Sequence, residues 1–547
     1  MAITLSDAYL GKLKEGVNEP NVILEVTLDS GTVKWGYSTG GFSDVLPIVK
    51  SLSSLQNKLD IKGGFVTLGQ ITVVISGRDN FKELLRDEFL KNRRVVRKDG
   101  FSAVTYDDYA ATFTGTIQNW SRRGDELTIT IADDMVKAKK KIPLENSTNT
   151  QVLDYRAMNP VDIMLDILSN RLGIDLLHID TAQFESERDI WLSGWKFDRL
   201  LTKPEDAIKY LGELQVETNS YIVHDGEKVS LKYFGPPTPG SDVLSWNDDI
   251  NILNATFTQR SGYAEGFFNR VVFYYDYDES GNDKPENFEA VYIATDTSSQ
   301  SSSEWNEVKT KVIKSRWVRT TTIAQPTDIS GVVIYHSSTA NGIGEGLLEF
   351  DYMANTLRWT APGSTGGEEV TLDKDGKYQL FDESKTKWVR VVVDTSSLPT
   401  SNKIDTVAIT ALSGNSFAAT IADKLLKRYR NPMSSVRLQV DINDLANGSK
   451  FLKPTDMVDL TTDEACGKDN DTWASERMMI TSLRPDFSGA RVDIEAVQAK
   501  MYRSYGFIAP TSYPDYPSAT SREREYAFIG DLNNKVSGGL DDGYYVW

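Results

Sequence analysis

Cysteine is almost absent from this chain of 547 residues, because Cys466 is its only one. One thiol cannot close an intrachain disulfide or build a thiolate-rich metal centre, so both devices are excluded. Histidine is nearly as scarce, with three residues far apart in the sequence. We expect His224, beside a predicted turn, to be an exposed turn neighbour, and His178 and His336 to be packed side chains rather than ligands.

Long apolar stretches are also missing. No apolar run approaches the roughly 18 residues that a membrane-spanning helix needs. The opening residues, MAITLSDAYLGKLKEG, lack the basic start and apolar core of a signal peptide. We therefore expect a soluble protein that is made in the cytosol. The composition, 40% hydrophobic and 25% charged, is that of a globular protein, and the length predicts about three to five domains.

Basic residues are outnumbered: 60 Lys and Arg stand against 78 Asp and Glu, which gives a net charge of −18. Gripping nucleic acid requires clustered cations, so this balance argues against general nucleic-acid binding, while it fits a surface past which DNA slides. Two basic runs interrupt the acidity. We expect solvated faces or intersubunit ion pairs, with docking onto an acidic partner as the alternative. The runs are Lys91, Arg93, Arg94, Arg97 and Lys98, and Lys137, Lys139, Lys140 and Lys141.

Motifs for phosphate binding and nucleophilic catalysis are incomplete. A phosphate-binding loop needs a lysine after its second glycine, but the stretch from Gly64 to Gly69 is followed by Gln70. The pentapeptide around Ser416 ends in Ala418 instead of the glycine of a nucleophile elbow. The sequence therefore predicts no catalytic residue, no cofactor and no resident metal. A second glycine cluster misses the spacing of a dinucleotide-binding loop, so we expect a flexible turn at Gly342, Gly344 and Gly346.

One acidic stretch, DYDESGND, resembles half of a calcium-binding loop. Asp276, Asp278, Ser280 and Gly281 match the first half, but Asn287 occupies the position of the closing bidentate carboxylate. The stretch also follows a predicted strand and not a helix. We favour an acidic β-turn, with a bound ion near Asp276 as the alternative.

Tryptophans raise the question of sugar binding. Trp191 and Trp195 flank one predicted turn, where they could stack on a sugar but are expected to pack a helix onto a sheet. Four others lie between residues 283 and 405, and glycan contact by some of them is an open alternative. These are Trp305, Trp317, Trp359 and Trp388.

Residues 1–142 are predicted to form a small β-barrel or sandwich. Short segments rich in β-branched and aromatic residues alternate between polar and apolar positions; in DELTITIAD the leucine and both isoleucines share one face. One helix is predicted over residues 79–90, with Asp79 and Asn80 as caps.

The middle of the chain, residues 143–250, is predicted to be an α/β domain. Apolar residues at helical spacing indicate helices over 159–174 and 203–215, the first with a proline in its opening turn and a glycine at its exit. A β-hairpin that turns at Asp225 and Gly226 should follow.

The last part returns to β-structure. We assign residues 251–282 and 406–500 to one discontinuous β domain, which includes a helix from residue 417. An inserted β-sandwich-like module is predicted at 283–405. The final segment, 501–547, is rich in Pro, Tyr, Gly and Asp and is predicted to be an extended tail that gains order against a partner or a neighbouring domain.

The order of these features resembles that of the central hub proteins of phage tail tips and baseplates, found in long-tailed, siphophage-like viruses. The likeness touches most of the chain outside the predicted insertion. It is carried by LPIVKSLSSLQNKLDIKGGFVTLGQITVVISG, AATFTGTIQNWSRRGDELTITIADDM, NPVDIMLDILSNRLGID, YIVHDGEKVSLKYFGPP, NRVVFYY, FAATIADKLLKRYRNPMSSVRLQV, LKPTDMVDLTTDE and YPDYPSATSREREYAFIGDLNNKVSGGLDDGYYVW.

This resemblance implies a mainly β protein with α+β parts, in which two hub-type β-barrels flank an α/β domain. It implies a structural, non-enzymatic virion protein of the tail tip that is assembled in the host cytoplasm. Three subunits would then place six barrels in a ring that joins a sixfold tail tube to threefold tip parts. Genomic DNA would pass through the ring without specific binding.

The implied partners are two further copies of the chain, the tail tube and distal tail proteins, and tail-tip or fibre proteins. The inserted module at 283–405 is expected to contact a host-surface glycan or another tail protein. Two alternatives stay open: a host-surface glycan-binding or adhesin-type tail protein, and a tail enzyme that degrades cell wall.

Overall fold

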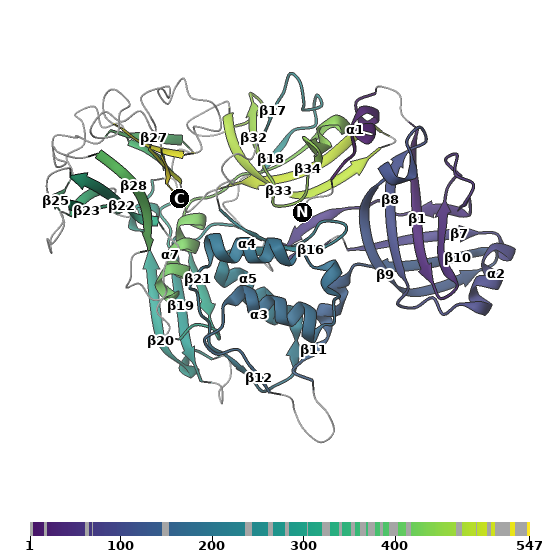
Figure 1. Cartoon of the computed structure of the whole chain (residues 1–547), viewed down its shortest axis with the longest axis horizontal. Helices are drawn as coiled ribbons and strands as arrows, with labels where there is room; N and C mark the ends of the chain where they lie inside the picture. Colours follow the sequence, from purple (N-terminus) through teal and green to yellow (C-terminus); the bar gives the residue numbers. More distant parts are fainter. Residues whose placement is uncertain are drawn as a thin grey trace.

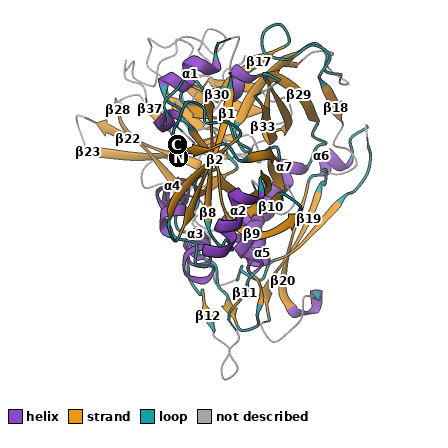
Figure 2. Ribbon diagram, turned by 90° about the vertical axis from the view of Figure 1, so that its right-hand side faces the viewer, coloured by secondary structure: helices purple, strands orange, loops and turns teal. Residues whose placement is uncertain are grey.

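The computed structural model describes, with side chains, residues 4–15, 19–59, 69–144, 152–235, 243–260, 266–278, 284–303, 305–319, 417–466, 473–487 and 489–499. Elsewhere it describes only strand backbones, whose bounds are given below. The described chain is mainly β-sheet with some helices, as the sequence predicts (Figure 1, Figure 2).

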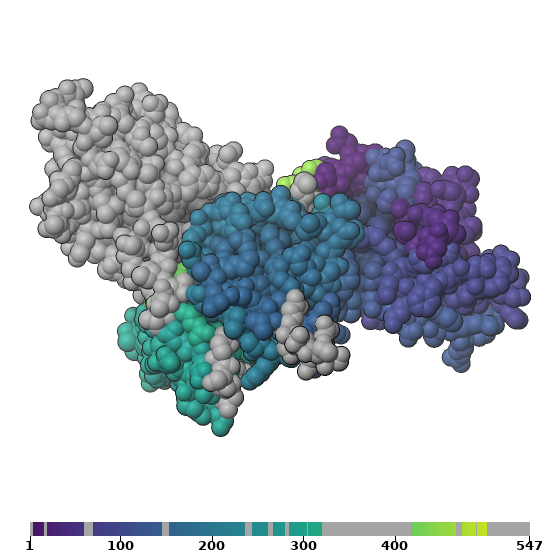
Figure 3. All heavy atoms as spheres, turned by 60° about the horizontal axis from the view of Figure 1, so that its bottom comes forward, coloured from purple at the N-terminus to yellow at the C-terminus, as the bar shows by residue number. Residues whose placement is uncertain are grey.

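The N-terminal part forms a sheet that we call unit 1. Its strands are β1 (Pro20–Leu28), β2 (Gly31–Gly36), β3 (Val45–Leu46), β4 (Val49–Leu52), β7 (Gln70–Ser76), β8 (Arg94–Phe101), β9 (Ala110–Arg123) and β10 (Glu126–Ala132). Their order is β3-β2-β1-β8-β9-β10-β7-β4. In β10, Leu127, Ile129 and Ile131 are fully buried, which confirms the predicted alternation. Figure 3 shows unit 1 as a lobe at one end of the molecule.

The two edge strands of unit 1, β3 and β4, are consecutive in the chain, because only Pro47 and Ile48 separate them. The sheet must therefore curl to bring its two edges together. Among the described strands no ladder joins β3 to β4, so no closed barrel is detected there. Pro47 lacks an N–H and lies where the ladder would close. The Ser76 amide donates to the Ile48 carbonyl at 2.9 Å, which extends the β4–β7 ladder by one residue.

Helix α2 (Arg78–Asp87) follows β7 and lies close to the predicted range. Gly77 occupies its N-cap position and makes no side-chain cap, so the prediction that Asp79 and Asn80 cap the helix is wrong. The reason is that Gly77 has a φ of 89°, which lets the chain turn directly out of β7 into the helix.

The middle domain contains the predicted helices and hairpin. Asn159 caps the first helix and Pro160 opens it, and Gly173 has the left-handed φ expected at its exit. The elements are α3 (Pro160–Asp166), its π-helical continuation Ile167–Arg171, α4 (Thr181–Trp191), α5 (Ala207–Thr218), β15 (Ser220–His224) and β16 (Val229–Tyr233), with the short pairs β11 (Lys141–Ile142) with β14 (Glu205–Asp206) and β12 (Leu153–Asp154) with β13 (Leu200–Leu201).

A second sheet, which we call unit 2, lies beside unit 1 (Figure 1). Its strands are β17 (Leu244–Asn247), β18 (Thr258–Arg260), β29 (Ser435–Asp441), β32 (Met457–Thr462), β33 (Trp473–Asp486) and β34 (Arg491–Gln498). Their order is β17-β32-β33-β34-β29-β18. A hairpin from the N-terminal part, β5 (Asn57–Asp60) and β6 (Phe65–Thr67), extends the same sheet between β33 and β15.

The N-terminal helix α1 (Asp7–Leu13) packs on unit 2, although the sequence assigns it to the first β domain. The Tyr9 ring lies 5.6 Å from that of Phe451, which belongs to the hairpin of β30 (Ala446–Asn447) and β31 (Lys450–Phe451). It also lies 5.1 Å from Phe101 of unit 1, so α1 ties the two units together.

The predicted boundary at residue 282 differs from the observed strand pairing. Strand β19 (Arg270–Tyr277) pairs with β20 (Phe288–Thr295) and β21 (Thr310–Lys314), and not with unit 2. Helix α7 (Phe417–Tyr429) contacts β19 and β20. Phe273 of β19 and Phe417 of α7 are fully buried in the same core, and this shared apolar face holds β19 away from unit 2. The short helix α6 (Thr297–Gln300) follows β20.

Two five-stranded sheets are described by their backbone alone. The first has the order β25-β24-β23-β22-β28 and the second β26-β27-β36-β35-β37, so strands of the predicted tail pair with strands of the predicted module. Their bounds are β22 (Ile329–Ser338), β23 (Gly342–Asp351), β24 (Thr356–Thr360), β25 (Glu368–Glu369), β26 (Tyr378–Asp382), β27 (Lys387–Val392), β28 (Lys403–Ala411), β35 (Tyr505–Ile508), β36 (Tyr526–Gly530) and β37 (Tyr544–Val546).

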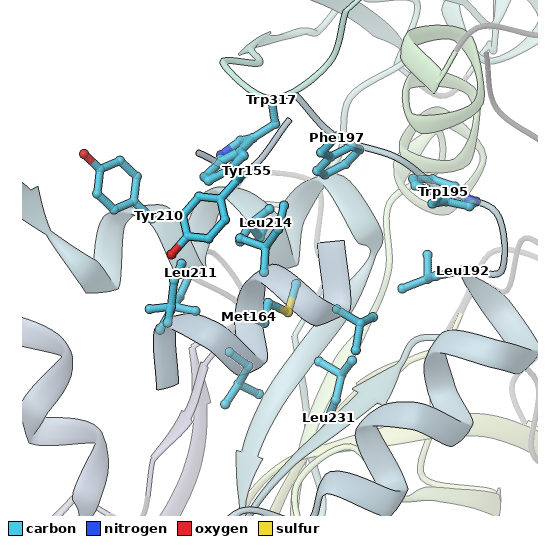
Figure 4. Packing of buried hydrophobic residues seen from close by; sticks show 14 of the residues in the cluster. Tyr155, Met164, Leu192, Trp195, Phe197, Tyr210, Leu211, Leu214, Leu231 and Trp317 are labelled. Atoms are coloured by element: carbon cyan, nitrogen blue, oxygen red, sulfur yellow. The ribbon is translucent and has the colours of Figure 1, made fainter. Parts of the chain in front are cut away.

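Two fully buried tryptophans, Trp195 and Trp317, lie in the core of the middle domain. Trp317, from the segment after β21, is fully buried beside Tyr155 and Tyr210, and Trp195 lies beside Phe197 (Figure 4). This core joins the middle domain to the sheet of β19–β21. Within the described part of the chain, no helix has both the length and the apolarity needed to cross a membrane.

Candidate functional site

Units 1 and 2 have the same strand topology. Six strands of each unit can be numbered in chain order: β1, β4, β7, β8, β9 and β10 in unit 1, and β17, β18, β29, β32, β33 and β34 in unit 2. In both sheets the spatial order is then 1-4-5-6-3-2. One pairing differs, because β1 runs antiparallel to β8 whereas β17 runs parallel to β32.

The ladders also agree in register. All seven β9–β10 pairs recur in β33–β34, at an offset of 363 residues on the first strand and 365 on the second; Thr116 opposite Ala132 corresponds to Met479 opposite Val497. The bulge falls at the same place, at Gln118 and at Thr481. The seven β7–β10 pairs recur in β29–β34 at an offset of 365. Since a one-residue slip would reverse every side chain, this agreement is a strong sign of structural equivalence.

Backbone geometry repeats where strand 4 of each unit begins. In unit 1 the Asn92 amide donates to the Ile117 carbonyl at 2.7 Å, and Asn92 has a φ of 66°. In unit 2 the Thr455 amide donates to the Ile480 carbonyl at 2.8 Å, and Thr455 has a φ of 82°. Left-handed φ is costly for threonine, so its presence at the equivalent position marks a turn that the architecture requires.

The two cores use equivalent inward positions. Ile71, Val73 and Ile75 of β7 are fully buried, and their counterparts in β29 are nearly so. These counterparts are Val436, Leu438 and Val440. Each unit therefore buries its own apolar face, as two independent sheets of one design would.

The hairpin of β5 and β6 joins the units. Lys58 and Asn57 pair with Ser482 and Leu483 of β33, so a segment of the N-terminal part completes the sheet of unit 2. The Gln56 side-chain amide donates to the Ser482 hydroxyl at 3.2 Å. On its other side the hairpin pairs with β15 of the middle domain. Three parts of the chain are therefore linked through one continuous ladder.

A buried ion pair lies at this junction. Arg97 donates to Asp99 at 2.8 Å from Nη2 and at 3.0 Å from Nε, and both residues are buried. The Thr112 hydroxyl also donates to Asp99. A cavity of about 40 Å³ beside the pair is lined by these residues together with Asp225 and Leu483, among others. Unit 1, the middle domain and unit 2 therefore all border the cavity beside the pair.

Replacing Arg97 by leucine should destabilise the chain by about 2–3 kcal/mol, because Asp99 would stay buried without its cationic partner and with the Thr112 hydroxyl as its described side-chain donor. Denaturant unfolding measures the change. The double variant Arg97→Leu/Asp99→Leu should recover most of the loss, since it removes the orphaned charge. Equal stability of the single variant and the native chain would contradict this account.

The hairpin turn between β15 and β16 packs against β9. The turn falls at Asp225 and Gly226, as predicted, and Gly226 has a φ of 106°. A methyl group there would lie 2.6 Å from the Thr112 carbonyl oxygen. Glycine is required both by its backbone conformation and by this close approach.

Gly226→Ala should therefore cost about 1–3 kcal/mol and loosen the middle domain from unit 1. Thermal unfolding measures the cost, and amide exchange in β9 reports the loosening. Gly124→Ala is the matched control, because Gly124 also has a left-handed φ but its Cβ position is open. An equal loss in the two variants would show that only φ matters at Gly226.

The histidines differ from the expectation in one case. His224 is buried and its Nδ1 accepts from the Gly226 amide at 3.2 Å, so the prediction of an exposed turn neighbour is wrong. The cause is the packing of this turn on β9, which covers it. His178 is half-buried against Arg94. Burial and the Arg94 charge lower the pKa of His178. The side chain of His336 lies outside the described residues.

Several cations of the two basic runs pair with acidic residues of the same chain. Arg93 pairs with Asp29, and Lys98 lies 3.4 Å from Glu25. Lys137 lies 3.0 Å from Asp134. Intramolecular ion pairs therefore occupy several of these cations, which neither of the expected readings stated.

The tryptophan prediction of packing is confirmed for Trp191 and Trp195. The Trp191 ring stacks on Tyr233 at 4.9 Å, and Trp195 lies 5.0 Å from Phe417. Trp317 is fully buried, so it is not available to a glycan. The side chains of Trp359 and Trp388 lie outside the described residues.

The structure describes parts of the incomplete phosphate-binding, dinucleotide-binding and calcium-binding motifs. Gly69 precedes β7, and its amide donates to Asp133 at 3.2 Å. The three glycines at 342–346 lie in strand β23, so the predicted flexible turn is wrong there; this segment pairs with β22 along its length. Asp276 lies in β19 with its amide donating to the Val318 carbonyl at 3.1 Å, while residues 279–283 lie outside the described part. Across the described residues no cluster of His, Cys, Asp or Glu suited to a metal ion occurs.

Helix α5 carries a buried charge network toward the segment after β21. The Glu213 carboxylate accepts from Arg199 at 2.8 Å and from the Trp317 indole at 2.9 Å, and it pairs with Arg316. Arg316 also reaches Glu205 at 3.1 Å. One turn further along α5, the Ser315 hydroxyl donates to Glu217 at 2.7 Å. Burial raises the pKa of Glu217 to about 8.

A larger cavity, of about 630 Å³, lies between α5, α7, β21 and unit 2. Its walls include Lys309, Lys311 and Arg428. The Arg428 guanidinium lies 3.5 Å from the centre of the Phe234 ring and donates to the Asn219 side chain at 2.8 Å. Neutral groups thus hold this buried cation in place.

No protein-family model matches the chain, and no curated protein matches it. Solved structures with some likeness include the 43 kDa tail protein of prophage MuSo2 from Shewanella oneidensis, with a TM-score of 0.41 and 10% identity over 88% of this chain and 99% of that one. The tail protein from Neisseria meningitidis MC58 has a TM-score of 0.41 and 9% identity over 87% and 96%. A chain of the virion of a native gene transfer agent particle has a TM-score of 0.20 and 10% identity over 28% and 50%.

Proposed function

We propose that this chain is a structural phage virion protein: the trimeric central hub of the tail tip or baseplate, which joins a sixfold tail tube to threefold tip components. The observation that carries the proposal is the register-matched pair of β units in one chain. Three copies would supply six near-equivalent sheets. A closed ring of such sheets has both threefold and approximate sixfold symmetry, as an adaptor between the two requires.

We also propose that the ring forms part of the channel through which DNA is ejected. The acidic balance of the chain suits this role. With a net charge of −18, a passage through the ring would repel phosphate and let DNA slide without specific binding. Tail tube, distal tail and fibre proteins are the proposed neighbours. The region 283–405 is proposed to face outward and to meet a host-surface glycan or another tail protein.

The proposal is tested on the full chain by native mass spectrometry and electron microscopy. We expect a trimer whose projection has six lobes around a central hole, and binding of this trimer to the end of a tail tube. A chain that stays monomeric with and without tail tube, or an assembly without a threefold axis, would contradict the hub role.

A further inference from the structure

The cavity between α5, α7, β21 and unit 2 is positively charged, although the chain as a whole is acidic. Its described lining contains three cations, Lys309, Lys311 and Arg428, and no aspartate or glutamate. Glu307, outside this lining, lies 3.8 Å from Lys309. Lys311 and Arg428 form no ion pair with any described residue. In a chain with 78 acidic and 60 basic residues, such a cavity is a local site that attracts anions.

Arg428 is the most deeply buried of these cations, with 6% of its surface exposed. Its guanidinium donates from Nη1 to the Asn219 side-chain oxygen at 2.8 Å and from Nη2 to the Tyr221 hydroxyl. Its Nε has no described acceptor. All of these partners are neutral, whereas a buried cation is ordinarily paired with a counter-charge. An anion in the cavity would supply that counter-charge.

Apolar side chains form much of the remaining lining. They include Phe267, Phe268 and Met433, together with Ile313 of β21 and Leu425 of α7. The volume of about 630 Å³ lies within the range of about 300–1,000 Å³ that is typical of small-molecule pockets. A ligand that satisfies both the buried cation and this lining has a charged head and an apolar body.

We infer that this cavity binds a small amphiphilic organic anion. The carboxylate or phosphate head accepts hydrogen bonds from the Arg428 guanidinium, whose fork of N–H groups matches either oxyanion. The exposed Lys311 adds a second positive charge, and the apolar body lies against Phe267, Phe268 and Met433. Binding thus neutralises a buried charge and removes apolar surface from water in one step. The inference is independent of the hub role.

Isothermal titration calorimetry of the full chain tests the inference with dodecanoate and dodecyl phosphate, each below its micelle-forming concentration. We expect one saturable site per chain, and the tighter of the two ligands identifies the head group. Dodecanol has the same body without the charge, and acetate has the charge almost without the body. Both should bind at least about tenfold more weakly than the favoured anion. Equal binding of dodecanol would mean adventitious burial of an apolar chain and would overturn the inference, as would the absence of saturable binding by both anions.

Two variants locate the head group. Arg428→Met removes the charge, keeps an apolar side chain and should weaken binding of the favoured anion at least about tenfold. Lys311→Met should weaken it about threefold, and because Lys311 is exposed this change leaves the fold intact. Lys314→Met is the matched control, since Lys314 lies on the same strand outside the described lining, and its affinity should be native.

Circular dichroism establishes whether Arg428→Met is folded. Native affinity in a folded Arg428→Met chain overturns the inference. If that variant does not fold, Lys311→Met decides, and native affinity there overturns the inference. The oligomeric state of the chain plays no part in these measurements, so a failure here leaves the hub role standing, and a failure of the hub role leaves this site standing.

Discussion

Glu217→Gln should stabilise the chain, and most strongly above pH 8. The Glu217 carboxyl is fully buried, and burial raises its pKa from 4.5 to about 8. The Ser315 hydroxyl that donates to it at 2.7 Å can donate equally well to a glutamine oxygen. Glutamine keeps the shape and this hydrogen bond, but it has no proton to lose.

The direction of the pH dependence follows from linkage. Below about pH 4.5 the carboxyl is protonated in both the folded and the unfolded chain and costs no stability. As the pH rises toward 8 the unfolded chain loses this proton while the folded chain keeps it, so the free energy of unfolding falls. The shift corresponds to a loss on the order of 4 kcal/mol at and above pH 8.

Denaturant unfolding of the native chain and Glu217→Gln at pH 5, 7 and 9 measures the effect. The two curves should nearly coincide at pH 5 and diverge at pH 9. Glu213→Gln is the control on the same helix. Because Glu213 neutralises Arg199 and Arg316, its loss should destabilise the chain at all three values. A Glu217→Gln chain with the native pH dependence would show that another group causes it.

Trp317→Ala should destabilise the chain by about 3–5 kcal/mol. The Trp317 side chain is fully buried, its indole donates to Glu213 at 2.9 Å, and Arg199 lies 4.7 Å from its ring. It is the residue through which the segment after β21 enters the core of the middle domain (Figure 4). Removing it leaves a cavity and takes one of three donors from the Glu213 carboxylate, which keeps Arg199 and Arg316.

Thermal and denaturant unfolding with a probe in each region measure this loss. Trp305→Ala is the matched control, because that ring is only half-buried, and its loss should cost about 1–2 kcal/mol. We expect the Trp317 variant to lose cooperativity between the middle domain and the sheet of β19–β21. An effect no larger than that of the control would mean that this contact is not central.

Local patterns determined many elements. The alternation in DELTITIAD predicts a strand and the spacing after Asn159 predicts a helix, because a buried face repeats every two residues in a strand and about every 3.6 residues in a helix.

Helix α4 was not predicted from such a pattern. Its buried residues are Phe184, Glu187 and Trp191, and a buried carboxylate breaks the apolar period. Glu187 is satisfied by Lys232 and by the Tyr233 amide, which lie far away in sequence.

The equivalence of the two units was not readable in the sequence. When β9 is aligned with β33 at the observed offset, only Ala111 with Ala474 and Ile117 with Ile480 are identical. Position 97 is arginine and its counterpart is Leu460. A sheet needs an apolar residue at each inward position and a bulge where it bends, and many residues satisfy that requirement.

The sequence by itself determined the broad class of this protein: one cysteine, an acidic balance, no complete catalytic motif and short alternating strands predict a mainly β, multidomain chain. The tertiary structure decided which strands belong together. In the structure β19 pairs with β20 and β21 and not with unit 2, α1 packs on unit 2, and the β5–β6 hairpin pairs with it. One edge of β9 has no described partner over its second half. These pairings depend on contacts between residues hundreds of positions apart. Alternation within a strand indicates which face is buried, but it does not indicate which strand will pair with it.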